Sequence, residues 1–169
     1  MRWLTLLLLC YGCAMDAGVG NKGLETDRDG GLDSASNGCL SGDSPTLQLG
    51  SAGPAFEAWQ ESDPLVIETS SEGGLSLPFA IASRSTPRRA SLNAQFTLAD
   101  GTPLATATDL EVLLACHADG QLISEPQRLT VSWQGDAFEL FGAPAKLNVS
   151  IAFANGQQLS QEVTAEITF

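Results

Sequence analysis

The sequence predicts an all-β domain, an antiparallel β-sandwich, that follows a flexible N-terminal segment. Three observations lead to this fold class. From Pro45 onward, apolar and polar residues alternate with the two-residue period of a β-strand. The 3.6-residue period of an amphipathic helix is scarce in the same region. Glycine-containing pairs that favour tight turns separate the apolar runs.

Residues 1–13 have the features of an export signal that ends at a cysteine. Arg2 supplies a positive start, and the apolar run behind it ends by Met15 because Asp16 follows. A membrane-spanning helix needs about 20 apolar residues, so this run is too short to be one. A short apolar core behind a positive residue predicts a signal peptide, here with the small Gly12 at its end.

The end of this leader resembles a bacterial lipoprotein precursor, in which a leucine and two small residues precede a cysteine. Gly12 and Cys13 match that pattern, and Leu9 stands one place before the usual leucine. The resemblance implies acyl chains on Cys13, and two or more such chains hold a protein stably on a membrane. Ala14 after the cysteine implies the outer membrane of the cell envelope. The alternative is ordinary secretion, with Cys13 serving only as a signal residue.

A flexible linker is expected over 14–44. This stretch contains many Gly, Asp, Ser and Asn residues and few large apolar ones. Such a composition buries too little surface to offset the entropy cost of ordering. A flexible coil of this length spans roughly 30 Å, so the linker would hold the domain at 45–169 clear of a membrane.

The four cysteines leave one candidate disulfide. If cleavage removes Cys10 and lipid occupies Cys13, then Cys39 and Cys116 remain, and an oxidising compartment favours their pairing. The alternative is a free, buried Cys116, because it is in phase with Leu114 on an apolar face.

Nine strands are expected after Pro45. In 146–153, Leu147 and Val149 face one way while Asn148 and Ser150 face the other, which gives the one buried and one wet face of an antiparallel sheet. The expected strands are 46–49, 65–69, 77–83, 91–98, 110–116, 127–133, 137–141, 146–153 and 161–169. Pro78 lacks an N–H, so strand 77–83 is expected at a sheet edge.

Turn chemistry agrees with this strand pattern. Asp100-Gly101, Asp119-Gly120, Gln134-Gly135 and Asn155-Gly156 lie between apolar runs. Asp-Gly and Asn-Gly pairs supply the positive φ angles of tight hairpins. Short strands with regularly spaced turns predict a sandwich of about seven to nine strands, close to immunoglobulin and fibronectin type III domains, with an open barrel as the alternative.

The charge balance excludes two partner classes. The chain has 20 acidic and 8 basic residues, for a net charge of −12. Its only basic cluster is Arg84, Arg88 and Arg89. Nucleic acids and anionic lipid surfaces both need more clustered Lys and Arg, so neither is expected as a partner.

No catalytic, cofactor-binding or metal site is expected. His117 is the single histidine, and no Gly-x-Ser-x-Gly elbow accompanies it. A zinc site needs three or four His, Cys or carboxylate ligands, and His117 with Cys116 and Asp119 falls short. His117 is instead expected at the end of a strand that enters a turn. A site made of two carboxylates is the remaining enzymatic alternative, and only their spatial separation would reveal it.

Trp59 is the candidate contact surface. Trp133 is in phase with Leu129 and Val131, so it is expected in the core. Trp59 lies in a less regular stretch, where an exposed indole could stack on a sugar or a peptide.

The stretch 47–59 looks like the opening of a set of uncharacterised envelope lipoproteins of myxobacterial type. The matching features are Leu49-Gly50, Phe56-Glu57, Asp63 and Gly73-Gly74. The resemblance implies an immunoglobulin-like sandwich on an acidic tether, and no activity. Relatives often carry a histidine where Ser76 stands here, so a role for that histidine does not transfer.

The expected function is therefore non-enzymatic. The chain is expected to be a lipid-anchored envelope protein whose β-sandwich binds an unknown protein or glycan or has a structural role. The alternative is a secreted recognition module for a carbohydrate or protein ligand that uses Trp59.

Overall fold

The computed structural model describes residues 39, 44–53, 55–69, 73–84 and 86–169. The expected leader 1–13 lies outside these ranges, as does the expected linker 14–44 apart from Cys39 and Ser44. In the described ranges no helix has the length and apolar character that a membrane crossing requires.

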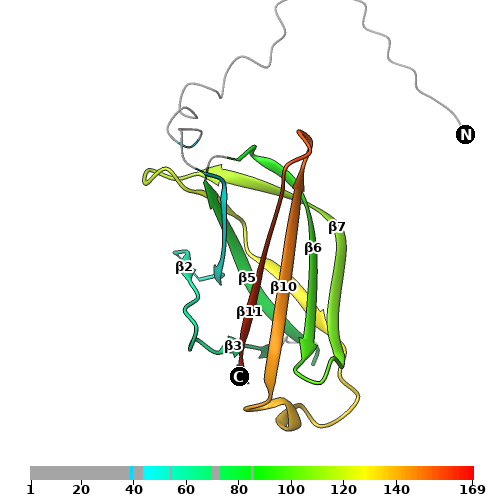
Figure 1. Cartoon of the computed structure of the whole chain (residues 1–169). Coiled ribbons are helices and arrows are strands. Elements are labelled where there is room, and N and C mark those ends of the chain that lie inside the picture. The colour runs from blue at the N-terminus through cyan, green and yellow to red at the C-terminus, as the bar shows by residue number, and fades with distance from the viewer. Residues whose placement is uncertain (1–38, 40–43, 54, 70–72, 85) are drawn as a thin grey trace, which may run out of the picture. The chain divides into compact units, whose positions relative to one another are not determined.

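The described chain is all-β, with eleven strands in one mixed, mostly antiparallel sheet (Figure 1). The elements are β1 (Thr46–Ser51), β2 (Glu57–Ala58), β3 (Leu65–Val66), β4 (Glu68–Thr69), β5 (Leu75–Arg84), β6 (Arg89–Leu98), β7 (Pro103–Cys116), β8 (Leu122–Ser124), β9 (Gln127–Val131), the 3-10 helix η2 (Ala137–Leu140), β10 (Pro144–Phe153) and β11 (Gln158–Thr168).

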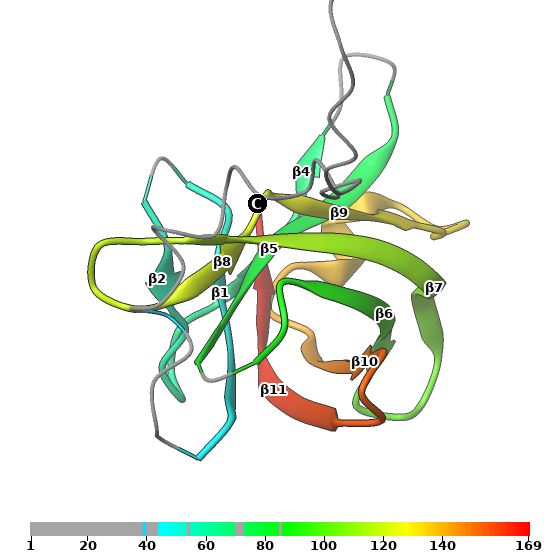
Figure 2. The same cartoon turned by 90° about the horizontal axis from the view of Figure 1, so that it is seen from above.

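Hydrogen bonds connect the strands in the order β2-β1-β5-β8-β7-β6-β10-β11-β3, with β4 and β9 attached to β5. The pairing of β11 with β3 is parallel, and the other pairings are antiparallel. Among the described residues β2 and β3 do not pair with each other, so the sheet is open. Viewed from above, β7 crosses from the side of β6, β10 and β11 to the side of β8, β5 and β1 (Figure 2).

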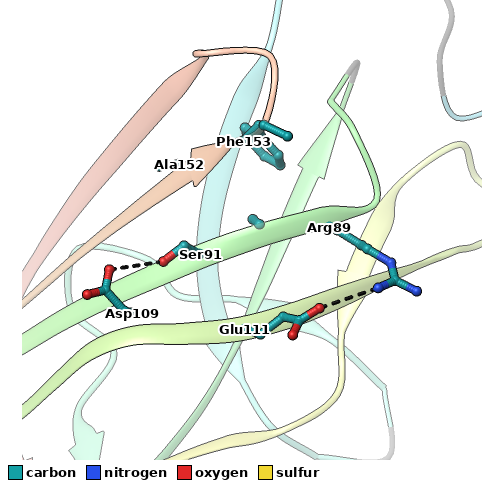
Figure 3. Close-up of a pocket in the computed structure, with 8 residues that line it drawn as sticks. Arg89, Ser91, Asp109, Glu111, Ala152 and Phe153 are labelled. Atoms are coloured by element: carbon teal, nitrogen blue, oxygen red, sulfur yellow. Dashed lines mark hydrogen bonds and ion pairs between the residues drawn. The ribbon is translucent and has the colours of Figure 1, made fainter.

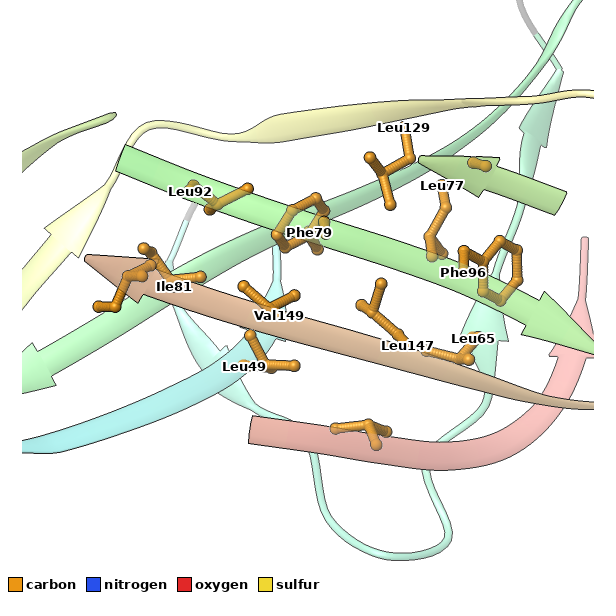
Figure 4. Close-up of a cluster of buried hydrophobic side chains, with 14 of the residues drawn as sticks. Leu49, Leu65, Leu77, Phe79, Ile81, Leu92, Phe96, Leu129, Leu147 and Val149 are labelled. Carbon is orange, nitrogen blue, oxygen red and sulfur yellow. The ribbon is translucent and has the colours of Figure 1, made fainter. Parts of the chain in front are cut away.

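The core lies between these two sides of the sheet (Figure 4). Strands β6 and β10 contribute alternate residues such as Phe96 and Leu147, and β5 contributes Phe79, all at 0% exposure. Burial of one such side chain contributes about 1.5–3 kcal/mol, so the shared core holds the two sides of the sheet against each other. Alternation along these strands, as expected from the sequence, is what places one face inside.

The strand count exceeds the expected seven to nine because β2 and β8 were not expected and 65–69 holds two strands, β3 and β4. A strand of two residues is too short to show the alternation of apolar and polar residues, so β2, β3 and β4 could not be recognised separately in the sequence. The expected strand 65–69 is accordingly divided into β3 and β4.

The expected strand 137–141 is wrong, because this segment forms η2. The Asp136 carboxylate accepts the N–H of Phe138 at 3.0 Å and caps the helix. The N–H of Phe141 donates to the Phe138 carbonyl at 3.2 Å and closes the turn. Only Leu140 is buried, while Phe138 and Phe141 are 81% and 64% exposed. The apolar–polar alternation of Phe138, Glu139 and Leu140 therefore does not mark a buried strand face, because Phe138 is exposed.

The expected strand 127–133 ends at Val131 in the structure. Trp133 leaves the strand, donates from its indole Nε1 to the Asp136 carbonyl at 3.0 Å, and still packs against the core as expected.

The expected edge position of Pro78 is also corrected. Strand β5 is central, with β1, β4, β8 and β9 as neighbours. Pro78 pairs with Arg128 of β9 on one side. On the other side of β5, the pairing with β4 stops at Ser76 and the pairing with β1 starts at Ala80. The missing N–H of Pro78 therefore lies in a gap between two partner strands.

The Asp100-Gly101 turn joins β6 to β7 as the sequence predicts. Gly101 has a φ of +90°, and its N–H donates to the Leu98 carbonyl at 2.9 Å. The Asp100 carboxylate accepts the N–H of Thr102 at 2.8 Å. This hydrogen bond stabilises the charged carboxylate and lowers its pKa below the ordinary 3.8.

We therefore expect acid to weaken this turn. The pKa of Asp100 is lower in the folded state, so its contribution to stability is present above the unfolded pKa and is lost as pH falls through the folded pKa. Carboxyl NMR should show Asp100 titrating below 3.8. Asp100→Asn keeps an acceptor for Thr102 and should remove this part of the acid-side pH dependence. An ordinary Asp100 titration would contradict the prediction.

Candidate functional site

A β-bulge interrupts the pairing of β6 with β7. The register shifts between Leu92 and Ala94, so that Asn93 lies opposite two residues of β7, the second being Asp109. Asp109 has a φ of +52°, a left-handed conformation that an aspartate adopts more readily than most residues. Bulges redirect side chains and often lie beside functional sites.

Two hydrogen bonds hold the bulge. The N–H of Asp109 donates to Oδ1 of Asn93 at 3.0 Å. The Ser91 hydroxyl lies 3.4 Å from Oδ1 of Asp109 and donates to it. Together they fix the Asp109 carboxylate on the outer face of the sheet (Figure 3).

The bulge also resets which β7 residues face the core. Before it Ala105 is buried, and after it Val112 and Leu114 are buried. Leu110 was expected on the same apolar face as Val112, yet it is 39% exposed because it directly follows the bulge. The expected strand 110–116 is the second half of β7, which begins at Pro103.

A depression of about 400 Å³ lies beside the bulge. Small and apolar residues of β6 and β10, including Ala152, line it together with the polar side chains of Arg89, Ser91, Asp109 and Glu111. Arg89 and Glu111 form an ion pair at 3.4 Å, and their side chains are 78% and 77% exposed. Such an exposed pair contributes little to stability, so both groups are available to a ligand.

The depression combines polar side chains with a largely apolar lining. It offers carboxylate acceptors from Asp109 and Glu111 and donors from Arg89 and Ser91. Among the described residues no group of three or more His, Cys, Asp or Glu side chains is placed to hold a metal ion. This site could not be predicted from the sequence, because a bulge changes the register without changing the local composition.

Cys39 and Cys116 form a disulfide with Cα atoms 6.0 Å apart. Cys39 belongs to the expected linker, yet it is 2% exposed and its Sγ lies 3.4 Å from the Gln121 carbonyl. Cys116 ends β7, and His117 follows at the start of the turn to β8, as the sequence predicts. The chain at residue 39 is therefore attached to the end of a central strand.

Trp59 lies half-buried between two hollows. Its backbone N–H donates to the Leu49 carbonyl of β1 at 2.9 Å, and its side chain packs against the core. A hollow of about 190 Å³ is lined by Trp59, Val66 and Arg128, among others. A second hollow of about 290 Å³ lies between Trp59 and β11. The candidate contact residue thus borders two surface hollows, and the expected lipidation site Cys13 lies outside the described residues.

The strained conformation at the bulge predicts opposite effects for two substitutions. Asp109→Gly relieves the positive φ and should leave the free energy of unfolding unchanged or raise it by up to about 1 kcal/mol. Asp109→Val should lower it by about 1–2 kcal/mol, since a branched side chain tolerates this φ poorly. Urea denaturation measures both, with Glu111→Val on the regular part of the strand as the control. Equal effects of the two Asp109 variants would contradict the assignment of strain.

The disulfide predicts a reductant-sensitive domain. Reduction, or Cys39→Ser with Cys116→Ser, should lower the free energy of unfolding by about 2–4 kcal/mol, because the unfolded chain loses a long covalent loop. Denaturation with and without reductant measures this, and the double variant should not respond to reductant. Two free thiols in the unreduced protein, detected by alkylation and intact mass, would exclude the bond.

A scan against protein-family models finds no match for this chain, and neither a search of the curated proteins nor a search of the solved structures returns one.

Proposed function

We propose that the protein is a non-enzymatic, lipid-anchored cell-envelope protein that displays its β-domain for binding or structural interaction. The anchor rests on the sequence: a positive Arg2, a short apolar run, and Gly12 before Cys13. Acyl chains on Cys13 would hold the protein on a membrane. Ala14 supports the outer membrane as its location.

The observation that carries the display function is the disulfide between Cys39 and Cys116. It fixes the point where the chain joins the domain at the β7–β8 turn. The 3-10 helix η2 (gold in Figure 1) lies at the opposite end of the domain from this turn. A domain attached at one end presents the rest of its surface to partners.

The pairing of the carboxylates in the bulge depression supports binding rather than a reaction. Its two carboxylates are already engaged, Glu111 by Arg89 and Asp109 by Ser91. Groups paired in this way can exchange their partners for the hydroxyl or amide groups of a ligand. An unknown protein or glycan is the partner class that fits such a surface.

For the fold we propose an immunoglobulin-like sandwich. The antiparallel group β7-β6-β10-β11 lies over β1 and β5, with the core between them. The resemblance of Leu49-Gly50 and Phe56-Glu57 to envelope lipoproteins supports the same classification.

The second candidate is a secreted recognition module for a carbohydrate or protein ligand. The position of Trp59 between two hollows favours it, because an indole can stack on a sugar or pack on a peptide. The two candidates differ in whether Cys13 carries lipid.

Metabolic labelling with a fatty-acid analogue tests the anchor. Wild type and Cys10→Ser should be labelled, since Cys10 is removed with the leader, whereas Cys13→Ser should lose the label. The wild-type protein should partition into the detergent phase on Triton X-114 separation. Equal labelling of wild type and Cys13→Ser, with release of both into the medium, would favour the secreted module.

A further inference from the structure

One edge of β11 is open over most of its length. Strand β11 pairs with β10 along one side, from Gln158 to Glu166. On the other side it pairs with β3 only at Ile167 and Thr168. Figure 1 shows β3 beside only the C-terminal end of β11. Over 158–166, no strand in the described part of the chain is hydrogen-bonded to this edge, although β1 approaches β11 to within 8 Å between Cα atoms.

A groove follows the open edge. One hollow of about 290 Å³ lies between Trp59–Glu61 and residues 161–164. The next, of about 610 Å³, lies between 61–64 and residues 164–166, with Pro144 at its side. The two hollows share Glu61 and Thr164 in their walls, so they lie next to each other along the strand. Six strand residues, 161–166, span roughly 17 Å, the length of an ordinary β-strand.

Residues 59–64 form the wall of the groove opposite β11, and hydrogen bonds hold this segment in place. Trp59 is fixed by its N–H to the Leu49 carbonyl at 2.9 Å. The N–H of Gln60 donates to Oδ2 of Asp63 at 2.7 Å, and the N–H of Asp63 donates to the Gln60 carbonyl at 3.1 Å. These hydrogen bonds stay within the wall or reach β1, so they leave the backbone edge of β11 facing the groove.

Gln161 brings an unsatisfied group to the same place. Gln161 lies two positions before the buried Val163 on the same face of β11, and it lines the first hollow. Its Oε1 is buried and has no hydrogen-bond partner. A buried acceptor left without a donor costs about 1–3 kcal/mol, so an N–H supplied by a ligand would remove a real penalty.

We propose that this groove binds an extended segment of another protein, which pairs with β11 as an added strand and carries basic residues at alternate positions. This inference rests on the proposed display function and names the class of partner. Strand addition uses main-chain hydrogen bonds for affinity and alternate side chains for specificity.

The charges along the groove favour a partner segment with basic side chains. Glu61, Glu162 and Glu166 line it, and none of the described lining residues is a lysine or arginine. Of these three carboxylates, Glu162 forms an ion pair with Lys146 at 3.3 Å among the described residues. Opposite charges facing each other on neighbouring strands stabilise the pair, and like charges destabilise it.

The same charges disfavour a second copy of this chain. Pairing β11 with another β11 would place acidic edges together in a protein whose net charge is −12. In a basic segment, by contrast, the residues facing outward meet Glu162 and Glu166. The residues facing inward meet Trp59 and can donate to Gln161.

The test uses the detergent-purified mature protein and a fluorescein-labelled peptide, Thr-Lys-Val-Lys-Thr-Lys-Val-Lys, followed by fluorescence anisotropy. Two further peptides carry N-methyl groups on alternate residues, one peptide on the odd-numbered positions and the other on the even-numbered positions. They keep the charge but remove one set of main-chain donors. We expect one N-methylated register to weaken binding by about tenfold or more. A peptide with Glu in place of Lys should not bind.

Charge-reversal variants locate the site. Glu61→Lys with Glu166→Lys should weaken binding by about tenfold or more, since two facing charges are reversed. Asp119→Lys with Glu125→Lys makes the same change in net charge outside the lining of the groove and should alter the dissociation constant by less than about twofold. Thermal melts check that both variants fold.

Three results would overturn the proposal: no binding of the basic peptide, no effect of N-methylation in either register, or equal weakening by both charge-reversal pairs. The last two would show nonspecific attraction to an acidic protein. Loss of peptide binding with fatty-acid labelling of Cys13 intact would reject this inference alone, and loss of labelling with peptide binding intact would reject only the lipid anchor.

Discussion

The fold depends on the burial of one face of β6 and β10 against β5. Alternate residues along these strands, among them Phe96, Leu147 and Phe79, are fully enclosed. A two-residue period allows only one face of each strand to be apolar, so a shift by one residue would expose every core side chain. The register of β6 with β10 is unbroken over nine pairs, and it holds the outer face in a fixed pattern as well.

Both candidate binding surfaces lie where this regular pairing stops. The bulge at Asp109 interrupts the β6–β7 ladder and leaves a depression on the outer face. The groove beside Gln161 follows the edge at which β11 has no further partner. Irregular or unpaired backbone offers hydrogen-bonding groups that the regular ladder has already used, which is why ligands and partner strands favour such places.

The sequence predicted what depends on local pattern. The strands 91–98 and 146–153, the Asp-Gly and Asn-Gly turns and the packing of Trp133 against the core follow from alternation and φ preferences. It did not predict what depends on pairing between distant residues, namely the bulge, the open edge of β11 and the parallel β3. The helix η2 was missed because Leu140 alone is buried there, and one residue defines no period. Trp59, the predicted contact residue, borders two surface hollows, but Gln161 on the opposite side of one of them could be found only from the fold.

The Cys39–Cys116 bond changes how the domain would respond to mechanical load. Tension applied from the N-terminal side reaches β7, which is hydrogen-bonded on both sides by β6 and β8. Without the bond, the same tension would reach β1 first and could unzip it from β5 one pair at a time. Oxidation thus replaces peeling of a terminal strand with shearing of a central strand, which must break several hydrogen bonds at once.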